Sequence, residues 1–171
     1  ADRIILSFYD PEMMAHVTTS SNFAWMFLFS LSGLAYISKV YVGQYNGAQH
    51  YQKTSHITWQ LIFFSILSII PFMIAYQIGP FLIPSAVQEH GLLYYQIIML
   101  FGFLWPMASA LIGFFIGTYQ SSIVMTALII GNMMNVGLDF ILIPQYGAAG
   151  AAWATIIAQV TLTLIMMWMY F

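Results

Sequence analysis

The apolar residues of this chain form long continuous runs, where a surface helix or a strand would alternate apolar and polar positions. A run such as LIFFSILSIIPFMIAY carries few polar side chains, and about twenty apolar residues in a helix cross the hydrocarbon core of a bilayer. A membrane β-barrel would instead alternate over units of about ten residues, so the runs predict helices. We expect about five full spans after the end of an earlier one: 1–9 (partial), 20–42, 56–78, 92–117, 122–143 and 148–171.

The composition indicates the same class of protein. The 171 residues are 61% hydrophobic and 5% charged, whereas about a quarter of the residues of a soluble domain are charged. The predicted fold class is therefore an all-α membrane protein, a bundle of transmembrane helices that forms a single lobe over residues 1–171. A net charge of −2 without a basic patch gives no indication of nucleic acid as a partner, and membrane lipid is the expected surrounding.

Polar segments and Gly or Pro residues separate the predicted spans. We interpret five segments as connections: DPEMMAHVTT as an exit loop, then GQYNGAQHYQKTS, PFLIPSAVQEHG, TYQS and PQYGAAG. Alternation of the spans puts Asp10, Glu12 and Glu89 on one side of the membrane. Lys39 and Lys53 fall on the other side, and Lys and Arg are enriched in cytoplasmic loops. The pattern therefore predicts a multi-pass protein of the cell (inner) membrane with GQYNGAQHYQK in the cytoplasm.

One acidic residue, Asp139, lies inside a predicted span, in the stretch NMMNVGLDFILIPQYG. An ionised carboxylate at mid-bilayer costs roughly 2.5–3.5 kcal/mol, so this side chain is expected to face the bundle interior or a wet cavity. Helical spacing places Asn132, Asn135 and Asp139 on one face. A carboxyl group shielded from water can carry a proton near neutral pH, and carboxylate and amide oxygens also suit a small hard cation. Simple hydrogen bonding between neighbouring helices is the third interpretation.

The last predicted span carries a second polar stripe. Thr155, Gln159 and Thr163 recur at intervals of four and share a helix face, although the Thr155 hydroxyl can equally bond its own backbone. The small residues of GAAGAAWAT at the start of this span favour close helix packing. Pro71 and Pro106 lie inside other spans and predict kinks, which transporters use as hinges.

The remaining polar residues indicate no enzyme chemistry. The four histidines fall in loops or at span ends without metal-ligand spacing, and no Ser–His arrangement suggests hydrolysis. We therefore expect no enzyme, no cofactor and no metal site of the histidine type. Taken alone, Asp2 beside Arg3 indicates a local ion pair, and Tyr94 with Tyr95 indicates an aromatic belt at the membrane interface.

Three segments carry motifs that occur together in one transporter family. ADRIILSFYDPEMMAHVTT is similar to the end of that family's first helix, and VYVGQYNGAQ resembles the Gln-x-x-Gly-Ala motif that closes its second. NVGLDFILIPQYGAAGAAWATIIAQ resembles its Asn-x-x-x-Asp and Gly-x-x-Gly-Ala-Ala-x-Ala-Thr signature. With their order and spacing kept across essentially the whole chain, these segments resemble the N-terminal lobe of a multidrug and toxin extrusion (MATE) transporter.

The resemblance implies a function and a set of site residues. Members of this family have twelve helices in two lobes around a central cavity, and they export cationic, amphipathic drugs in exchange for H⁺ or Na⁺. The cation-coupling residues of the family fall on Asp2, Tyr94, Asn135, Asp139 and Thr155, with Na⁺ possible at Asp2 and Asp139. Further polar candidates for the cavity are Asn132, Gln159 and Thr163.

Two features depart from the family's pattern. Arg3 stands where the family usually has Thr, and a cation beside Asp2 can compete with the coupling ion. The second lobe and most of the first helix are missing, and a lobe that cannot close a cavity cannot alternate access alone. We therefore interpret the chain as a partial sequence, whose partner would be the C-terminal lobe of the same protein.

Two other functions fit the same architecture. A flippase of lipid-linked oligosaccharides shares it, but would be expected to line its cavity with arginines for the pyrophosphate, and the spans have only Arg3. A structural subunit of a membrane complex, without transport activity, would bury its polar stripes in helix contacts and have no water-filled cavity.

Overall fold

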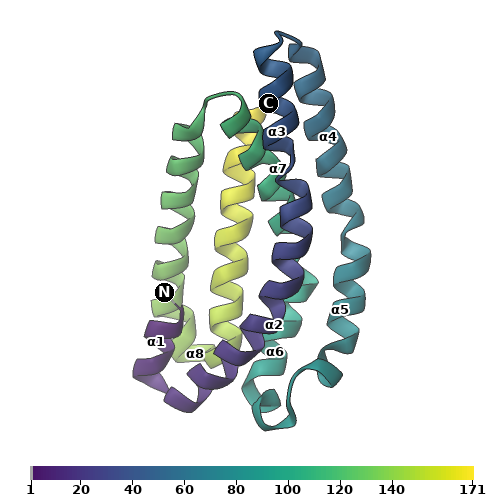
Figure 1. Cartoon of the computed structure of the whole chain (residues 1–171). Coiled ribbons are helices and arrows are strands. Elements are labelled where there is room, and N and C mark those ends of the chain that lie inside the picture. Colours follow the sequence, from purple (N-terminus) through teal and green to yellow (C-terminus); the bar gives the residue numbers. More distant parts are fainter. Residues whose placement is uncertain (1) are drawn as a thin grey trace.

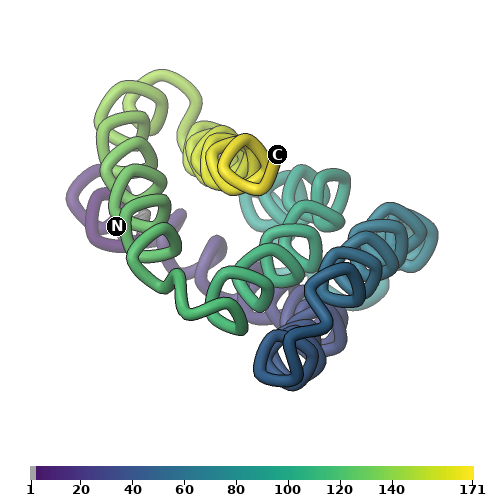
Figure 2. The backbone as a smooth tube through the Cα atoms, turned by 90° about the horizontal axis from the view of Figure 1, so that it is seen from above, coloured from purple at the N-terminus to yellow at the C-terminus, as the bar shows by residue number. Residues whose placement is uncertain are grey.

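A computed structural model of the chain describes the backbone of residues 2–171 and the side chains from Arg3 onward. The described residues form a bundle of helices, in which the longest helix folds back so that its two halves lie beside each other (Figures 1 and 2). In chain order the elements are α1 (Asp2–Tyr9), α2 (Pro11–Ala35), α3 (Ser38–Gly47), α4 (Tyr51–Leu67), α5 (Ile69–Leu82), the 3₁₀ turn η1 (Ser85–Val87), α6 (Gln88–Leu100), α7 (Leu104–Gly117) and α8 (Ser121–Tyr170).

The connection between α1 and α2 is much shorter than the sequence predicted. We expected DPEMMAHVTT to be an exit loop, but only Asp10 lies between the helices and α2 begins at Pro11. The Asp10 carboxylate accepts hydrogen bonds from the backbone N–H groups of Glu12 at 2.9 Å and Met13 at 3.1 Å. Proline at the first helical position has no N–H to leave unsatisfied. This N-cap and the following proline start the helix at once, although the segment is polar.

The predicted loop GQYNGAQHYQKTS is also mostly helical. The helix α3 continues to Gly47 and α4 begins at Tyr51, so the chain turns within residues 48–50. Gln49 at the turn has a φ of 60°. Polar residues can continue a helix beyond the apolar core of a membrane because the backbone hydrogen bonds are already made within the helix.

Both prolines inside predicted spans stand just after a break in the helix. The helix α4 ends before Ser68 and α5 begins at Ile69, which places Pro71 in the first turn of α5. Pro106 stands likewise in the first turn of α7, and the segments Ser85–Leu100 and Leu104–Gly117 are bent by 50°. Proline cannot donate the helical hydrogen bond to the preceding turn, so the helix is interrupted there.

The helix α8 folds back on itself at Gly147. This residue has φ 56° and ψ −128°, a conformation outside the helical region, which glycine adopts without a steric penalty. We call residues 121–146 the first arm and residues 148–170 the second arm; in Figure 1 they run side by side in light green and yellow. By length and apolar character, three helices can cross a membrane, or four if the bent pair is one span. One of the three is α8, which holds both arms.

Glycines allow the helices to approach closely at two crossings. A Cβ on Gly91 of α6 would collide with the Ser20 hydroxyl of α2, and one on Gly113 of α7 would collide with the Ser38 hydroxyl of α3. Beside the first crossing, the rings of His16 and His90 stack at a centroid distance of 5.7 Å. His16, which we placed in a loop, is therefore a buried residue of α2.

Two apolar clusters hold the bundle together. The larger one joins α1, α2, α5, α6 and the second arm of α8 around Leu6, Leu28, Phe72 and Tyr95. The Tyr95 hydroxyl in this cluster donates to the Ala75 carbonyl at 3.0 Å, so its buried polar atom is satisfied. The smaller cluster joins α4, α7 and both arms of α8. Together the clusters fix the two arms of α8 against α2, α6 and α7.

Candidate functional site

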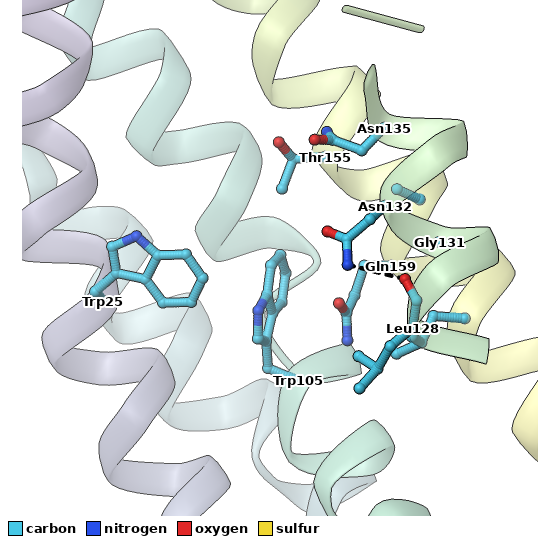
Figure 3. A pocket seen from close by; sticks show the side chains of 10 residues that line it. Trp25, Trp105, Leu128, Gly131, Asn132, Asn135, Thr155 and Gln159 are labelled. Atoms are coloured by element: carbon cyan, nitrogen blue, oxygen red, sulfur yellow. Dashed lines mark hydrogen bonds between the residues drawn. The ribbon is translucent and has the colours of Figure 1, made fainter. Parts of the chain in front are cut away.

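Two residues of each polar stripe predicted from the sequence line one cleft between the arms of α8. Asn132 and Asn135 on the first arm and Thr155 and Gln159 on the second arm line a cavity of about 230 Å³. In Figure 3 the asparagine side chains point away from their own helix toward Thr155, Gln159 and two indole rings. Because Gly147 reverses the chain, residues about twenty positions apart meet across the cleft.

Small residues form part of the wall of this cleft. Gly131 and Ala158 belong to its wall, and a Cβ on Gly131 would lie 3.4 Å from the Leu162 side chain. Thr155 donates to its own backbone at Ala151 over 3.0 Å, as we had considered from the sequence.

Two of the amide side chains in the cleft, Asn132 and Gln159, differ in how firmly hydrogen bonds hold them. The Asn132 Nδ2 donates to the Leu128 carbonyl one turn earlier at 2.9 Å, so its Oδ1 is directed into the cleft (Figure 3). The Gln159 Nε2 makes a longer bond of 3.4 Å to the Leu104 carbonyl at the start of α7. This bond ties the second arm to the break between α6 and α7.

Two tryptophans form the wall of the cleft that faces the amides. Trp25 on α2 and Trp105 on α7 meet edge to face, with ring centroids 6.1 Å apart and planes at 86°. Both rings line the cleft, with Trp25 reaching in from α2 (Figure 3). Sequence reasoning missed both residues, because a tryptophan inside an apolar run gives no signal of its own.

A second cleft of about 390 Å³ adjoins the first. It shares Trp25 and Thr155 with the first cleft and adds Arg3, Ser21 and Tyr94. The Arg3 Nη2 donates to the Ser21 hydroxyl at 2.9 Å and to the Asn22 amide oxygen at 3.3 Å. The expected ion pair between Asp2 and Arg3 lies outside the described residues, because the structure describes no side chain at Asp2.

Asp139 is not one of the residues that line the first cleft. Its side chain is fully buried, with 0% exposure, one helical turn beyond Asn135 on the first arm. Tyr94 is buried as well, at 6%, and lies on α6 in the wall of the second cleft. Thr163 is buried away from both clefts, where it donates to the Gln159 carbonyl at 2.8 Å.

The clefts are thus built mainly from uncharged polar groups and indole rings. Among the described residues, no group of three or more His, Asp or Glu side chains could hold a metal ion. Carboxylate, amide and hydroxyl oxygens are the donors present, and these suit a proton or a hard monovalent cation better than a transition metal.

Solved structures show which class of protein has this fold. The chain matches an outward-facing structure of a multidrug resistance MATE family transporter of the MOP superfamily, with a TM-score of 0.84, 22% identity, and coverage of 100% of this chain and 40% of that one. An inward-facing structure of such a transporter matches with a TM-score of 0.76, 21% identity, and coverage of 99% and 40%. A MOP superfamily transporter from Pyrococcus furiosus, whose binding pocket is described as reversed in polarity, matches with a TM-score of 0.85, 21% identity, and coverage of 99% and 39%.

The fold is therefore one lobe of a MATE-type transporter, and the chain spans about 40% of the length of these relatives. The sequence itself matches the MatE family over residues 1–141. The chain belongs to the MatE family, as the three sequence motifs predicted. No curated protein matches the chain.

Proposed function

We propose that this chain is the N-terminal lobe of a secondary active antiporter, which exports cationic amphipathic compounds in exchange for H⁺ or Na⁺. One observation carries the proposal: a fully buried carboxylate, Asp139, lies one helical turn from the amides that line a polar cleft. An acid inside a membrane bundle is expensive, and its usual role is in an ion pathway. The lobe would act as a transporter and perform no enzyme chemistry.

The coupling step follows from the burial of Asp139. A carboxyl group enclosed by protein is stabilised when it takes up a proton or a cation, and it is destabilised when it is left charged. Asn135 and Thr155 offer oxygen atoms in the wall of the cleft, and Tyr94 and Asp2 complete the set that the family resemblance implies. Binding and release of the cation would shift the balance between two arrangements of the arms of α8, because a ligand favours the state to which it binds more tightly.

The two alternative functions have less support. A structural subunit would bury its polar stripes in helix contacts, whereas Asn132, Asn135 and Gln159 line an open cleft. A flippase for a pyrophosphate-linked lipid would need several basic side chains in the cavity, and Arg3 is the one arginine in the chain. The match to the MatE family over residues 1–141 also favours the drug antiporter.

The proposed topology in the cell membrane has five full crossings after the end of a first one. The first three of these crossings would be α2 with α3, α4 with α5, and the bent pair α6 with α7. The two arms of α8 would supply the fourth and fifth crossings, with Gly147 at the turn. Lys39 and Lys53 would then lie at the cytoplasmic end, following the positive-inside rule.

The test is Asp139→Asn in the full-length transporter, which keeps the shape of the side chain and removes its titratable proton. We expect efflux in a host that lacks its own drug pumps to fall to background, while the amount of protein in the membrane stays at the wild-type level. Glu89→Gln is the matched control, because it removes an exposed carboxylate from the first turn of α6. If the Asp139 variant exports drugs as well as the wild type, the coupling role is wrong.

A further inference from the structure

Two histidines from different helices meet at the crossing of α2 and α6. The His16 and His90 rings stack with their centroids 5.7 Å apart and their planes at 29°. His16 is a buried residue of α2, and His90 lies in the first turn of α6. The two residues are far apart in the sequence, so the spacing of the histidines along the chain does not indicate that they share a site.

The buried histidine has a ring nitrogen without a hydrogen bond. His16 is 8% exposed, and its Nδ1 is enclosed by protein with no hydrogen-bond partner among the described residues. A buried polar atom that is left unpaired is unfavourable, and each one in a folded protein calls for an explanation. A ligand that binds this nitrogen would supply one.

The separation of the two rings suits a shared metal ion. Neutral imidazole is the commonest ligand of protein-bound metals, and it suits zinc, copper and nickel. Because each bond from nitrogen to zinc is about 2.0–2.1 Å long, two imidazoles on one ion have ring centroids about 5–6 Å apart. The observed separation of 5.7 Å falls within that range. The terminal torsion of histidine is broad, so rotation of the rings can turn one nitrogen of each toward the same ion.

An ion can reach the pair from the side of His90. This residue is half-buried, and its neighbour Glu89 is exposed. Among the described residues, no third His, Asp or Glu side chain completes a group that could hold a metal ion, so water would fill the other positions on the ion. Structural zinc sites use four protein ligands. A site with two histidines is therefore expected to bind its ion reversibly.

An ion held by both rings would fasten α2 to α6. The two helices are already close at this crossing, since a Cβ on Gly91 would collide with the Ser20 hydroxyl and would come within 2.9 Å of the His16 carbonyl oxygen. A ligand favours the arrangement to which it binds more tightly. A bound ion would therefore oppose any motion that separates the two histidines.

We propose that His16 and His90 form a binding site for a divalent transition-metal ion such as Zn²⁺, and that the bound ion holds α2 against α6. Neither histidine lines one of the two polar clefts. The ion is therefore an effector at a separate site, distinct from the H⁺ or Na⁺ of the proposed function. The proposal does not depend on the transport role, and binding is tested without an ion gradient.

Calorimetric titration of the purified full-length transporter with Zn²⁺ in detergent tests the site. We expect His90→Gln to weaken Zn²⁺ binding by about tenfold or more, because even the residues that support metal ligands change metal affinity by about 10–100-fold. His16→Gln should have the same effect. The double variant should bind Zn²⁺ about as weakly as either single variant, since each substitution removes the same shared site.

Two controls make the result specific. His56→Gln removes an exposed histidine from α4 and should leave the affinity for Zn²⁺ unchanged. Mg²⁺ prefers oxygen ligands and should not bind at the pair. If the buried variant His16→Gln does not fold, His90→Gln supplies the decisive comparison, because its ring is only half-buried.

Two further measurements separate metal binding from simple packing of the rings. Pulsed electron paramagnetic resonance of Cu²⁺, added below one equivalent, counts the imidazoles on the ion. We expect two in the wild type and at most one in His90→Gln. Zn²⁺ should also raise the melting temperature of the wild type but of neither histidine variant, because an ion that binds only the folded state stabilises it.

Three outcomes would overturn the metal site: unchanged affinity for Zn²⁺ in His90→Gln, an equal loss in His56→Gln, or a rise in melting temperature with Zn²⁺ that persists in both variants of the pair. The first would mean that the two rings only pack at the crossing. The outcome for Asp139→Asn is independent, because it is read from efflux and not from metal binding. A failed coupling role with an intact metal site would thus be recognised.

Discussion

Gly150 packs directly against the backbone of Leu142, where the second arm of α8 leaves the turn at Gly147. A Cβ on Gly150 would collide with the Leu142 carbonyl oxygen and would come within 3.0 Å of the Ile143 nitrogen. Backbone atoms cannot move aside as a flexible side chain can. The close approach of the two arms beside the turn therefore requires a residue without a side chain at this position.

Gly150→Ala should consequently open the turn of α8. We expect a loss of about 1–3 kcal/mol of folding free energy, as for other overpacked sites. Thermal unfolding of the full-length transporter in detergent measures this loss of stability. Gly137→Ala is the control on the same helix, because a Cβ there has nothing within 4 Å, and helix propensity alone would stabilise it by about 1 kcal/mol at most. Equal melting temperatures of the two variants would contradict the account of the turn.

Gly91→Ala should separate α2 from α6. A Cβ on Gly91 would collide with the Ser20 hydroxyl and would come within 2.9 Å of the His16 carbonyl oxygen. Ser20→Ala removes the first collision and leaves the second, so the double variant should recover only part of the lost thermal stability. Gly33→Ala on α2 is the control, since a Cβ there also has nothing within 4 Å. Full recovery in the double variant would show that the backbone contact is unimportant.

Trp105→Leu should weaken the binding of aromatic compounds selectively. Leucine keeps apolar bulk in the wall of the cleft but removes the ring that meets Trp25. An aromatic contact contributes about 0.5–1.5 kcal/mol beyond buried area, so rhodamine 123 should bind about two- to tenfold more weakly. Tetrabutylammonium has no ring, so its affinity, measured by competition with rhodamine 123, should fall less. Trp168→Leu, at a side chain 78% exposed, is the matched control, and an equal loss there would argue against a role of the cleft.

How much of the fold the sequence predicted depends on how local the physical cause of each feature is. The apolar runs predicted the membrane class, and Pro71 and Pro106 predicted the interruptions before α5 and α7, because each effect acts within a few residues. The same reasoning failed at DPEMMAHVTT, where polar composition was taken as a loop. The capping geometry of Asp10 followed by Pro11 carries the information that decides this point and is visible in the sequence.

For the candidate site, too, the sequence predicted the features that have a local cause. Helical periodicity alone placed Asn132, Asn135 and Asp139 on one face, and the burial of Asp139 agrees with the cost of a charge in a membrane. The coupling roles of these residues remain a prediction. Asp2 also remains one, because its side chain lies outside the described part of the chain.

The sequence by itself determined that the chain is a membrane bundle, which of its faces are polar, and which family it belongs to, since hydropathy, periodicity and motifs are local properties. Only the tertiary structure decided that Asn132 and Asn135 share a cleft with Thr155 and Gln159, that Trp25 and Trp105 line it, and that Arg3 donates to Ser21 and Asn22. Those relationships join residues on different helices or on different arms of α8. They depend on the reversal at Gly147 and on the close crossings at glycines, which bring together side chains whose spacing along the chain carries no signal.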